Sequence, residues 1–321
     1  MMEDFFILAL QFKIMQGIVT KSMGLWYLVE GSDGTSYQCR LKGKFKLENK
    51  KISNPVAVGD KVDLIDDEGN KDAKIIATIH PRRNYIIRTS PKKKGHGHII
   101  ASNIDLAVIV ATVATPRTSL GFIDRFLVTA EAFRIPAMVL CNKIDLLSPE
   151  ELSGLKEKMK EYENLGYQTA FISALDKKDI ESFKKRLSNQ TTLISGHSGV
   201  GKSTLVNNLI PEADQKTSEI SEFSEKGIHT TTFAERFRVA DDSYIIDTPG
   251  IKELGLAEIE SHELSHYFPE LRELLGQCKF NNCTHTHEPG CAIASAYEEG
   301  EISQSRYDSY LSMLLGDDNR R

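Results

Sequence analysis

Residues 196–203 read Gly196-His197-Ser198-Gly199-Val200-Gly201-Lys202-Ser203, and Thr204 follows them. This Gly-x4-Gly-Lys-Ser pattern comes directly after a short apolar run, Thr192–Ser195, and opens a stretch with helical periodicity, Ser203–Leu209. Glycines in such a loop let backbone N–H groups wrap around phosphate oxygens, and the helix N-terminus adds its dipole. We therefore predict a nucleotide-phosphate loop in which Lys202 reaches the β- and γ-phosphates and Ser203 ligates Mg²⁺.

Two other segments fit the γ-phosphate end of the same nucleotide. Asp247 ends an apolar strand, where a carboxylate close to the Mg²⁺ ion is expected, and Gly250 can offer its N–H to the γ-phosphate. One of three consecutive threonines, Thr230 or Thr231, is expected to complete the Mg²⁺ shell and close its loop over the nucleotide. The alternative for these threonines is the start of a threonine-rich strand.

The residue that positions the catalytic water is not the usual one. Ile251 stands where Ras-like enzymes carry a glutamine, and an isoleucine can neither donate nor accept the required hydrogen bond. We therefore expect slow intrinsic hydrolysis, with the missing group supplied by a partner or another loop. His229 is the candidate within the chain; a buried structural role is the alternative for it.

A second pair of motifs predicts recognition of a guanine base. In Asn142-Lys143-Ile144-Asp145, the Asp145 carboxylate can accept from N1–H and the 2-amino group of guanine, a donor pair that adenine lacks. Asn142 would tie this segment to the phosphate loop, and the Lys143 stem would cover the base. Ser173 and Ala174 would present backbone N–H groups to guanine O6. These motifs make GTP and GDP the expected ligands.

The base-recognition motifs precede the phosphate loop, which reverses the order of an ordinary small GTPase. A circular permutation explains the reversal, because it joins the old termini and opens the chain elsewhere. Short apolar runs alternate with helical stretches from residue 103 to 255, as in an α/β domain with a parallel sheet. The expected strands are Leu106–Val113, Ala137–Cys141, Thr169–Ile172, Thr192–Ser195 and Tyr244–Ile246, and the helices are Ile123–Phe133, Glu151–Leu165, Ile180–Leu187 and Ser203–Leu209.

The N-terminal region, residues 15–90, has the pattern of a small β-barrel such as the OB-fold. Five short alternating runs separated by turn signals are the expected strands: Gly17–Thr20, Leu25–Glu30, Tyr37–Arg40, Lys61–Ile65 and Ala73–Ile79.

This region is basic within an acidic chain. Residues 12–100 hold 17 Lys and Arg against 9 Asp and Glu, while the whole chain has a net charge of -5. The asymmetry favours contact with a polyanion, and Arg82, Arg83, Arg88 and Lys92–Lys94 could follow a phosphate backbone. A solvated basic surface and a barrel that docks only protein are the alternatives.

The ends and connections carry weaker signals. Residues 91–102 are rich in Lys, Gly and His and are predicted to be a linker, and residues 211–227 are predicted to be a mobile loop.

Residues 1–14 are interpreted as an extension. The alternatives are that they form an added edge strand, or that translation begins at Met15. Glu3 and Asp4 occupy the place where a signal peptide carries positive charge. No apolar run approaches the roughly 20 residues of a membrane span, so we expect a cytoplasmic protein.

A cysteine cluster marks the third domain, residues 256–321. Cys278-x4-Cys283-x-His285-x5-Cys291 supplies the Cys₃His set of one structural zinc ion; His287 could replace His285. Helices are expected on either side, at His262–Leu275 and Ile302–Leu315. Cys39 and Cys141 lie in strand patterns and are interpreted as ordinary buried thiols.

The motif order, the phosphate loop, the segment from Gly227 to Thr232 and the cysteine spacing together resemble the RsgA family, also called YjeQ or YloQ. The likeness runs through the chain from Gln16. It implies an N-terminal OB-fold, a circularly permuted P-loop GTPase domain and a C-terminal helical zinc-binding domain. Ile228 stands where the family often has arginine, which removes any charge stabilisation by an arginine there.

The resemblance also implies the biological role. It implies GTP hydrolysis stimulated by the 30S ribosomal subunit, contact with 16S rRNA and action in late small-subunit maturation. We expect a monomer with neither DNA nor a membrane as partner. The alternatives are a permuted GTPase of large-subunit assembly, against which the basic barrel and zinc module argue, and a nucleotide hydrolase acting on a small molecule.

Overall fold

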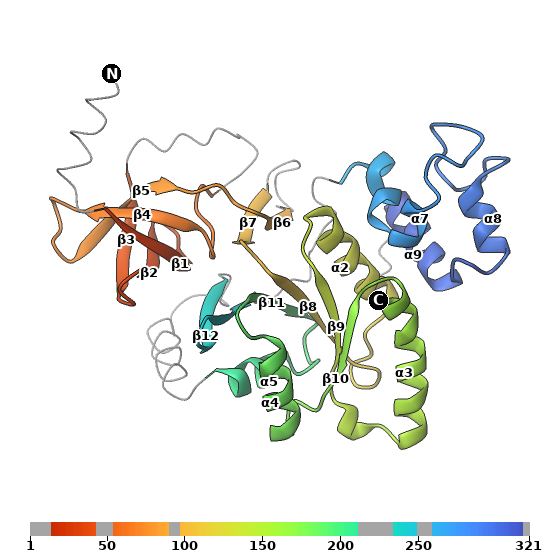
Figure 1. Ribbon diagram of the computed structural model, residues 1–321, viewed down its shortest axis with the longest axis horizontal. Helices are drawn as coiled ribbons and strands as arrows, with labels where there is room; N and C mark the ends of the chain where they lie inside the picture. Colours follow the sequence, from red (N-terminus) through yellow and green to blue (C-terminus); the bar gives the residue numbers. More distant parts are fainter. Residues whose placement is uncertain (1–13, 43–53, 90–96, 211–233, 249–258, 317–321) are drawn as a thin grey trace. The chain divides into compact units, whose positions relative to one another are not determined.

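The computed structural model describes residues 14–42, 54–89, 97–210, 234–248 and 259–316 (Figure 1). The chain forms two compact units, each built from separate stretches of sequence. The first unit contains Met1–Asp105, Lys184–Ile194 and Val206–Gly250, and the second contains Leu106–Phe183, Ser195–Leu205 and Ile251–Arg321. Residues 1–13 of the predicted extension and the predicted loop at residues 211–227 lie outside the described residues.

The first unit begins with a closed five-stranded barrel, shown in red and orange in Figure 1. Its strands pair in the order β1-β2-β3-β5-β4, and β4 pairs again with β1 to close the barrel. All neighbours are antiparallel except β3 and β5, which are parallel. The strands are β1 (Met15–Met23), β2 (Trp26–Gly31), β3 (Ser36–Leu41), β4 (Lys61–Asp66) and β5 (Ala73–Ile79).

The barrel core is apolar because alternate strand positions point inward. Its buried cluster includes Val19, Val29, Leu64 and Ile76, each fully buried. All five predicted strands are therefore present, and the five-stranded barrel is confirmed.

A hairpin follows the barrel where part of a linker was predicted. Strand β6 (Tyr85–Thr89) pairs antiparallel with β7 (Gly97–Ser102). The linker prediction is therefore wrong for residues 97–102. Ile99 and Ala101 alternate as buried residues in β7, and the Lys- and Gly-rich segment before them concealed this short pattern.

The first unit also contains three strands from later in the chain. β11 (Thr191–Gly196) pairs in parallel with β13 (Ser243–Asp247), and β12 (Glu235–Ala240) pairs antiparallel with β13. β12 was not predicted, because its six residues include three charged ones and its buried positions, Arg236 and Val239, do not form an apolar alternation. β12 also pairs with β1, where Lys21 lies opposite Glu235 and forms a 3.0 Å ion pair with it.

The second unit contains three parallel strands with helices packed on them. β8 (Leu106–Ala111), β9 (Ala137–Cys141) and β10 (Gln168–Phe171) pair in that order. All residues of β8 and β9 are buried, as expected for a covered parallel sheet. Helices α2 (Leu120–Ala132) and α3 (Pro149–Asn164) contact these strands, and α4 (Lys177–Arg186) follows β10.

Local capping explains where the two long helices begin. Ser119 accepts a hydrogen bond from the Phe122 N–H at the start of α2. Ser148 and Glu151 form a capping box at the start of α3, with Pro149 in the first turn. These side chains satisfy N–H groups that lack partners at a helix start.

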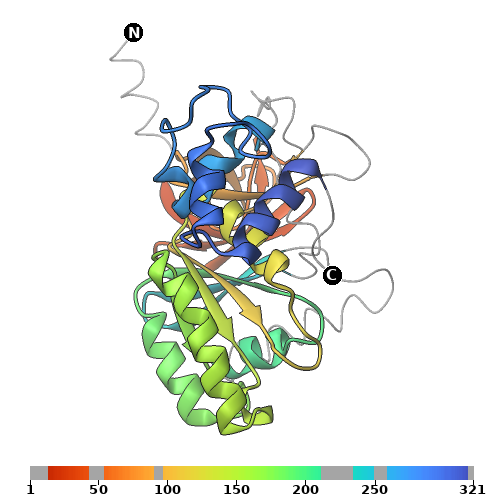
Figure 2. The same ribbon diagram turned by 90° about the vertical axis from the view of Figure 1, so that its right-hand side faces the viewer.

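The C-terminal domain of the second unit consists of short elements, seen as the blue cluster in Figure 2. The continuous helix predicted for His262–Leu275 is wrong, because Phe268 is extended before Pro269 and separates a 3₁₀ helix from a single turn. A residue before proline is forced away from helical angles. The elements are η2 (Ser261–Tyr267), α7 (Pro269–Arg272), α8 (Ala292–Glu298) and α9 (Gln304–Leu315).

None of the helices among the described residues combines the length and apolarity that a membrane span requires.

Candidate functional site

The phosphate loop connects β11 to α5 (Lys202–Leu209). Gly199 and Gly201 both adopt positive φ angles, 87° and 88°, which glycine tolerates best. A Cβ atom at Gly201 would lie 2.5 Å from Nδ2 of Asn142, so a side chain is excluded there. Ser198, Ser203 and Thr204 are exposed. The loop therefore has a fixed inner side and an open outer side, as phosphate binding requires.

Asn142 joins the phosphate loop to the two base-recognition segments. Its Nδ2 donates to the backbone oxygen of Val200 at 2.8 Å, across 58 residues of sequence. Its Oδ1 accepts from the Ala174 N–H at 2.9 Å. Asn142 is 2% exposed. One buried side chain thus holds three motifs that lie far apart in the sequence.

The rest of the base-recognition segment faces outward. Lys143 adopts a left-handed conformation with φ of 62°, and its Nζ donates to the Thr115 oxygen at 2.7 Å. Asp145 lies in a 3₁₀ turn, Ile144–Leu146, and is exposed. Its carboxylate is therefore accessible to a base.

The structure changes the expectation for Ser173 and Ala174. The Ser173 N–H donates to Asp179 Oδ2 at 2.7 Å, and the Ala174 N–H donates to Asn142. Both groups that were expected to bind guanine O6 therefore make protein contacts here. Asp179, in the first turn of α4, was missed; the signal available for it was an acidic residue near a helix N-terminus.

The phosphate loop has a second side-chain contact that sequence reasoning missed. The ring of His197 stacks on the ring of Phe122, with centroids 3.6 Å apart and an interplanar angle of 28°. Phe122 lies in the first turn of α2 and is buried. An apolar residue on a buried helix face gives no sequence signal for such a contact.

Asp247 ends β13 in the first unit. The parallel register places Asp247 opposite Ile194 of β11, and the Thr248 hydroxyl donates to the Ile194 oxygen at 3.3 Å. The remaining predicted residues at the γ-phosphate end lie outside the described residues: His229, Thr230, Thr231 and Gly250.

The cysteine cluster has the geometry of a tetrahedral metal site. The four candidate ligand atoms of Cys278, Cys283, His285 and Cys291 lie within 4.8 Å of one another. His285 Nδ1 lies 3.6 Å from the Cys278 sulfur and 3.5 Å from the Cys291 sulfur. Tetrahedral zinc bonds of the usual lengths place sulfur and nitrogen about 3.6 Å apart. The four side chains could therefore hold one zinc ion.

The protonation chemistry of the cluster agrees with this fit. Burial lowers the pKa of His285, which favours the neutral imidazole that binds metals. Burial raises the pKa of the Cys283 thiol, so a thiolate there needs the charge of a cation. His287 instead makes a 2.7 Å contact with the Thr286 hydroxyl, which leaves His285 as the histidine of the cluster.

Side chains outside the cluster hold its loop in place. Glu288 accepts from the backbone N–H groups of Thr284 and Thr286, at 2.7 and 3.0 Å. The Tyr307 and Tyr310 hydroxyls donate to backbone oxygens of His285 and Thr284. The loop is therefore fixed by α9 as well as by its own residues.

Two of the basic residues after the barrel, Arg82 and Arg83, form ion pairs within the protein. Arg82 donates to both carboxylate oxygens of the buried Asp60 at 2.7 Å. Arg83 pairs with Asp105 at 2.6 Å. The Arg82 guanidinium is therefore paired with a carboxylate within the protein, and its contact with a phosphate backbone stays a prediction. The side chains of Arg88 and Lys92–Lys94 lie outside the described residues.

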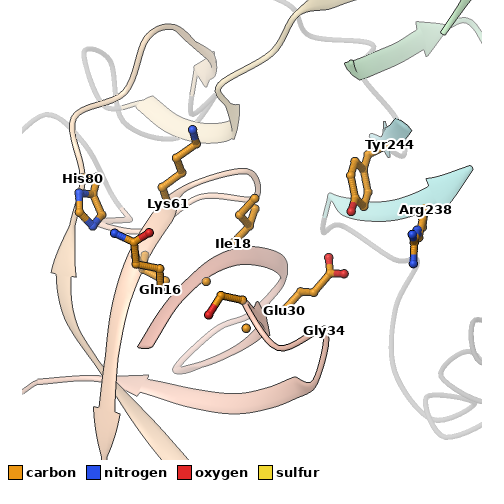
Figure 3. A pocket seen from close by; sticks show the side chains of 12 residues that line it. Gln16, Ile18, Glu30, Gly34, Lys61, His80, Arg238 and Tyr244 are labelled. Atoms are coloured by element: carbon orange, nitrogen blue, oxygen red, sulfur yellow. The ribbon is translucent and has the colours of Figure 1, made fainter. Parts of the chain in front are cut away.

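The first unit also has an open groove of about 540 Å³ between the barrel and the β12–β13 hairpin (Figure 3). Several of its charged side chains already have partners. Glu30 pairs with Arg236 at 3.1 Å and His80 with Asp63 at 2.9 Å. Both the acidic side chain and the histidine of the groove are therefore already paired within the protein. The lining side chains labelled in Figure 3 are Gln16, Ile18, Glu30, Lys61, His80, Arg238 and Tyr244.

Two family matches cover most of the chain. The RsgA N-terminal domain family matches residues 16–75, and the RsgA GTPase family matches residues 79–257. The second match alone covers more than half of the chain. The chain belongs to the RsgA GTPase family.

Curated RsgA proteins are similar over almost their whole length. The small ribosomal subunit biogenesis GTPase RsgA of Cytophaga hutchinsonii is 50% identical over 310 residues, which is 96% of this chain and 100% of that protein. The protein of the same name from Bacteroides fragilis is 48% identical over 301 residues, covering 94% and 96% of the two chains.

Solved structures confirm the predicted fold class. YjeQ from Thermotoga maritima superposes with a TM-score of 0.74 at 33% identity, covering 96% of this chain and 100% of that one. YloQ, described as a circularly permuted GTPase, gives a TM-score of 0.72 at 26% identity, with 96% of each chain covered. The chain is therefore an RsgA-type P-loop GTPase with an N-terminal barrel, a permuted GTPase domain and a C-terminal domain carrying the cysteine cluster.

Proposed function

We propose that this chain binds GTP and Mg²⁺ at the phosphate loop and acts with the small ribosomal subunit in its late maturation. The observation that supports the nucleotide site most directly is the buried Asn142 side chain, which bonds to both Val200 and Ala174. This contact fixes the distance between a loop suited to phosphates and a segment suited to guanine. The names of the relatives support the ribosomal role.

Within the site, the proposed roles follow the chemistry of each side chain. Lys202 neutralises the β- and γ-phosphates, Ser203 ligates Mg²⁺, and Asp145 accepts from guanine. Asp247 and a threonine, Thr230 or Thr231, complete the magnesium end. His229 is the proposed residue for positioning water.

The other modules have proposed roles of their own. The barrel contacts 16S rRNA, and the C-terminal domain binds one structural zinc ion through its Cys₃His cluster. We further propose that the protein works as a cytoplasmic monomer. Zinc has a closed ligand set in this cluster, so it stabilises the domain and takes no part in hydrolysis.

The test compares the rate of GTP hydrolysis alone, with purified 30S subunits and with 50S subunits. We expect a slow rate alone and an increase of at least about tenfold with 30S subunits only, because Ile251 cannot orient water and His229, the proposed replacement, acts efficiently only when the partner is bound. Lys202→Ala is the control for contaminating hydrolase. Equal rates with and without 30S subunits would contradict the proposal, and stimulation by 50S subunits alone would support a large-subunit role.

A further inference from the structure

Helix α2 uses two opposite faces for two different contacts. At 3.6 residues per turn, residues two positions apart lie about 200° apart around the helix, whereas residues four apart share a face. Phe122 and Phe126 therefore lie on one face, and Asp124 and Val128 lie on the other. All four are at least 96% buried. α2 is enclosed on both sides, so a shift of one face moves the other.

The first face contacts the phosphate loop through Phe122. The stacked rings of Phe122 and His197 give this glycine-rich loop an aromatic contact at its second residue. Asn142 holds the loop again at Val200, three residues later. Stacking of two rings restricts both the distance and the tilt of His197. The first half of the loop is thus placed by α2, and the second half by Asn142.

The opposite face contacts the C-terminal domain through a buried charge network. Asp124 accepts from Arg306 Nη1 at 2.8 Å and from the Ser309 hydroxyl at 2.5 Å, both on α9. Arg306 also donates from Nε to Glu270 Oε1 at 2.7 Å. Asp124 is fully buried and Arg306 is 1% exposed. Separating these side chains would leave a buried charge without its partner, which is strongly unfavourable.

The same face continues into the rest of the C-terminal domain. Val128, one turn after Asp124, belongs to the apolar cluster that includes Leu264 and Phe268. Glu131, at the next turn, pairs with Arg272 at 3.0 Å. Three successive turns of α2 thus contact this domain, and α2 and the domain behave as one packed body.

We propose that Phe122 is a positioning residue for the phosphate loop, and that the C-terminal domain sets its position through the Asp124–Arg306 pair. The proposal rests on the proposed function only in that the loop binds nucleotide. A partner that shifts the C-terminal domain would then change nucleotide affinity, and bound nucleotide would change affinity for that partner by the same factor.

The first experiment measures the rate at which a fluorescent GDP analogue dissociates from the full-length protein. We expect Phe122→Leu to increase the rate at least about fivefold, because leucine fills much of the volume but cannot stack. Phe122→Tyr, which keeps the ring face, should stay within about twofold of the parent. Phe126→Leu is the matched control on the same face of α2, since Phe126 is equally buried.

The outcomes separate the two proposals. If the parent protein fails to bind the GDP analogue, the proposed nucleotide function is wrong. If the parent binds it and Phe122→Leu and Phe126→Leu have the same dissociation rate, the positioning role of Phe122 is wrong. A Phe122→Tyr variant as fast as Phe122→Leu would likewise exclude stacking as the reason.

The second experiment tests the path from the C-terminal domain. Arg306→Met should increase the GDP dissociation rate about fivefold in the parent protein. In the Phe122→Leu background it should increase that rate less than about twofold, because the C-terminal domain acts on the phosphate loop through Phe122. Arg272→Met is the comparison at the same contact surface: its ion pair with Glu131 is about half exposed, so its loss should accelerate GDP release less than Arg306→Met does. Equal acceleration by Arg306→Met in both backgrounds, or none in either, overturns the path.

Bound zinc is measured in every variant to show that the C-terminal domain is folded. If Arg306→Met does not fold, Arg306→Lys replaces it with the same criteria, because lysine keeps the charge and loses the two-pronged contact with Glu270.

Discussion

The N-terminal barrel and the C-terminal domain are held together by different means. In the barrel, five strands of six to nine residues pair in a closed ring. Each strand therefore forms backbone hydrogen bonds with a neighbouring strand on both of its edges. In the C-terminal domain, α7 has four residues and α8 has seven. Such short elements leave backbone groups that side chains must satisfy, as Tyr307, Tyr310 and Glu288 do around the cysteine cluster.

Both regions contain a buried ion pair, but one pair joins neighbouring segments of the chain and the other joins two domains. Asp60 and Arg82 join neighbouring segments at the barrel, where Asp60 also accepts from the Ala57 N–H and the Ser102 hydroxyl. Asp124 and Arg306 join residues 182 positions apart in sequence. The barrel pair fixes local structure, whereas the second pair fixes one domain to another. The C-terminal domain therefore relies on side-chain contacts, and on the zinc ion that we propose, where the barrel relies on strand pairing.

The largest effect is expected from removing the metal site with Cys283→Ser. The free energy of zinc binding in small domains is on the order of 10 kcal/mol, and it is also the folding free energy of such a domain. The C-terminal domain should therefore lose zinc and its cooperative unfolding transition. Trp26, the single tryptophan of the chain, lies in β2 and reports on the barrel. Its fluorescence transition in urea should not change.

The matched control is Cys39→Ser, which replaces the buried cysteine of the barrel. It should leave one zinc ion per chain. If Cys283→Ser retains stoichiometric zinc, or if Cys39→Ser loses it, the proposal that only the C-terminal domain is stabilised by zinc is wrong.

A smaller effect is expected from Asp124→Ala. Removing one partner of a buried pair costs about 3–5 kcal/mol, because Arg306 is left without its main counter-charge inside the protein. Urea denaturation followed by zinc release should show this loss. Asp241→Ala breaks the Arg238–Asp241 pair, in which Asp241 is 99% exposed, and should change stability by less than about 0.5 kcal/mol. Equal losses of stability in the two variants would show that burial of an ion pair does not determine its contribution to stability.

The smallest effect concerns pH and the barrel. The hydrogen bond from Arg40 lowers the pKa of Asp67 below its ordinary value. Because the folded pKa lies below the unfolded value of about 3.9, the stabilisation is complete above that pH and disappears as pH falls through the folded pKa.

The corresponding measurement uses Asp67→Asn and Trp26 fluorescence. Trp26 lies directly opposite Arg40 in the β2–β3 pairing, so it reports on this part of the barrel. The difference in urea midpoint between Asp67→Asn and the parent should be largest near pH 7 and shrink below pH about 4. A difference that is constant from pH 7 to pH 2 would exclude this ion pair as its source.

Much of the fold follows from local pattern. The bounds of β5 and β9 agree with the runs Ala73–Ile79 and Ala137–Cys141, because a buried strand is a short apolar run between turns. β7 and β12 were missed, since each is short and mixes charged or glycine residues with its buried ones. The break at Phe268 could have been predicted from Pro269 alone.

The sequence by itself determined the chemistry of this protein. The phosphate loop, the guanine motif and the cysteine spacing depend on residue type and short-range spacing, and their order identifies the permutation. Only the tertiary structure decided that Asn142 bonds to Val200, that Phe122 stacks on His197 and that Asp124 pairs with Arg306. These contacts join residues far apart in the chain. Their partners are set by packing of whole elements, which no local pattern encodes.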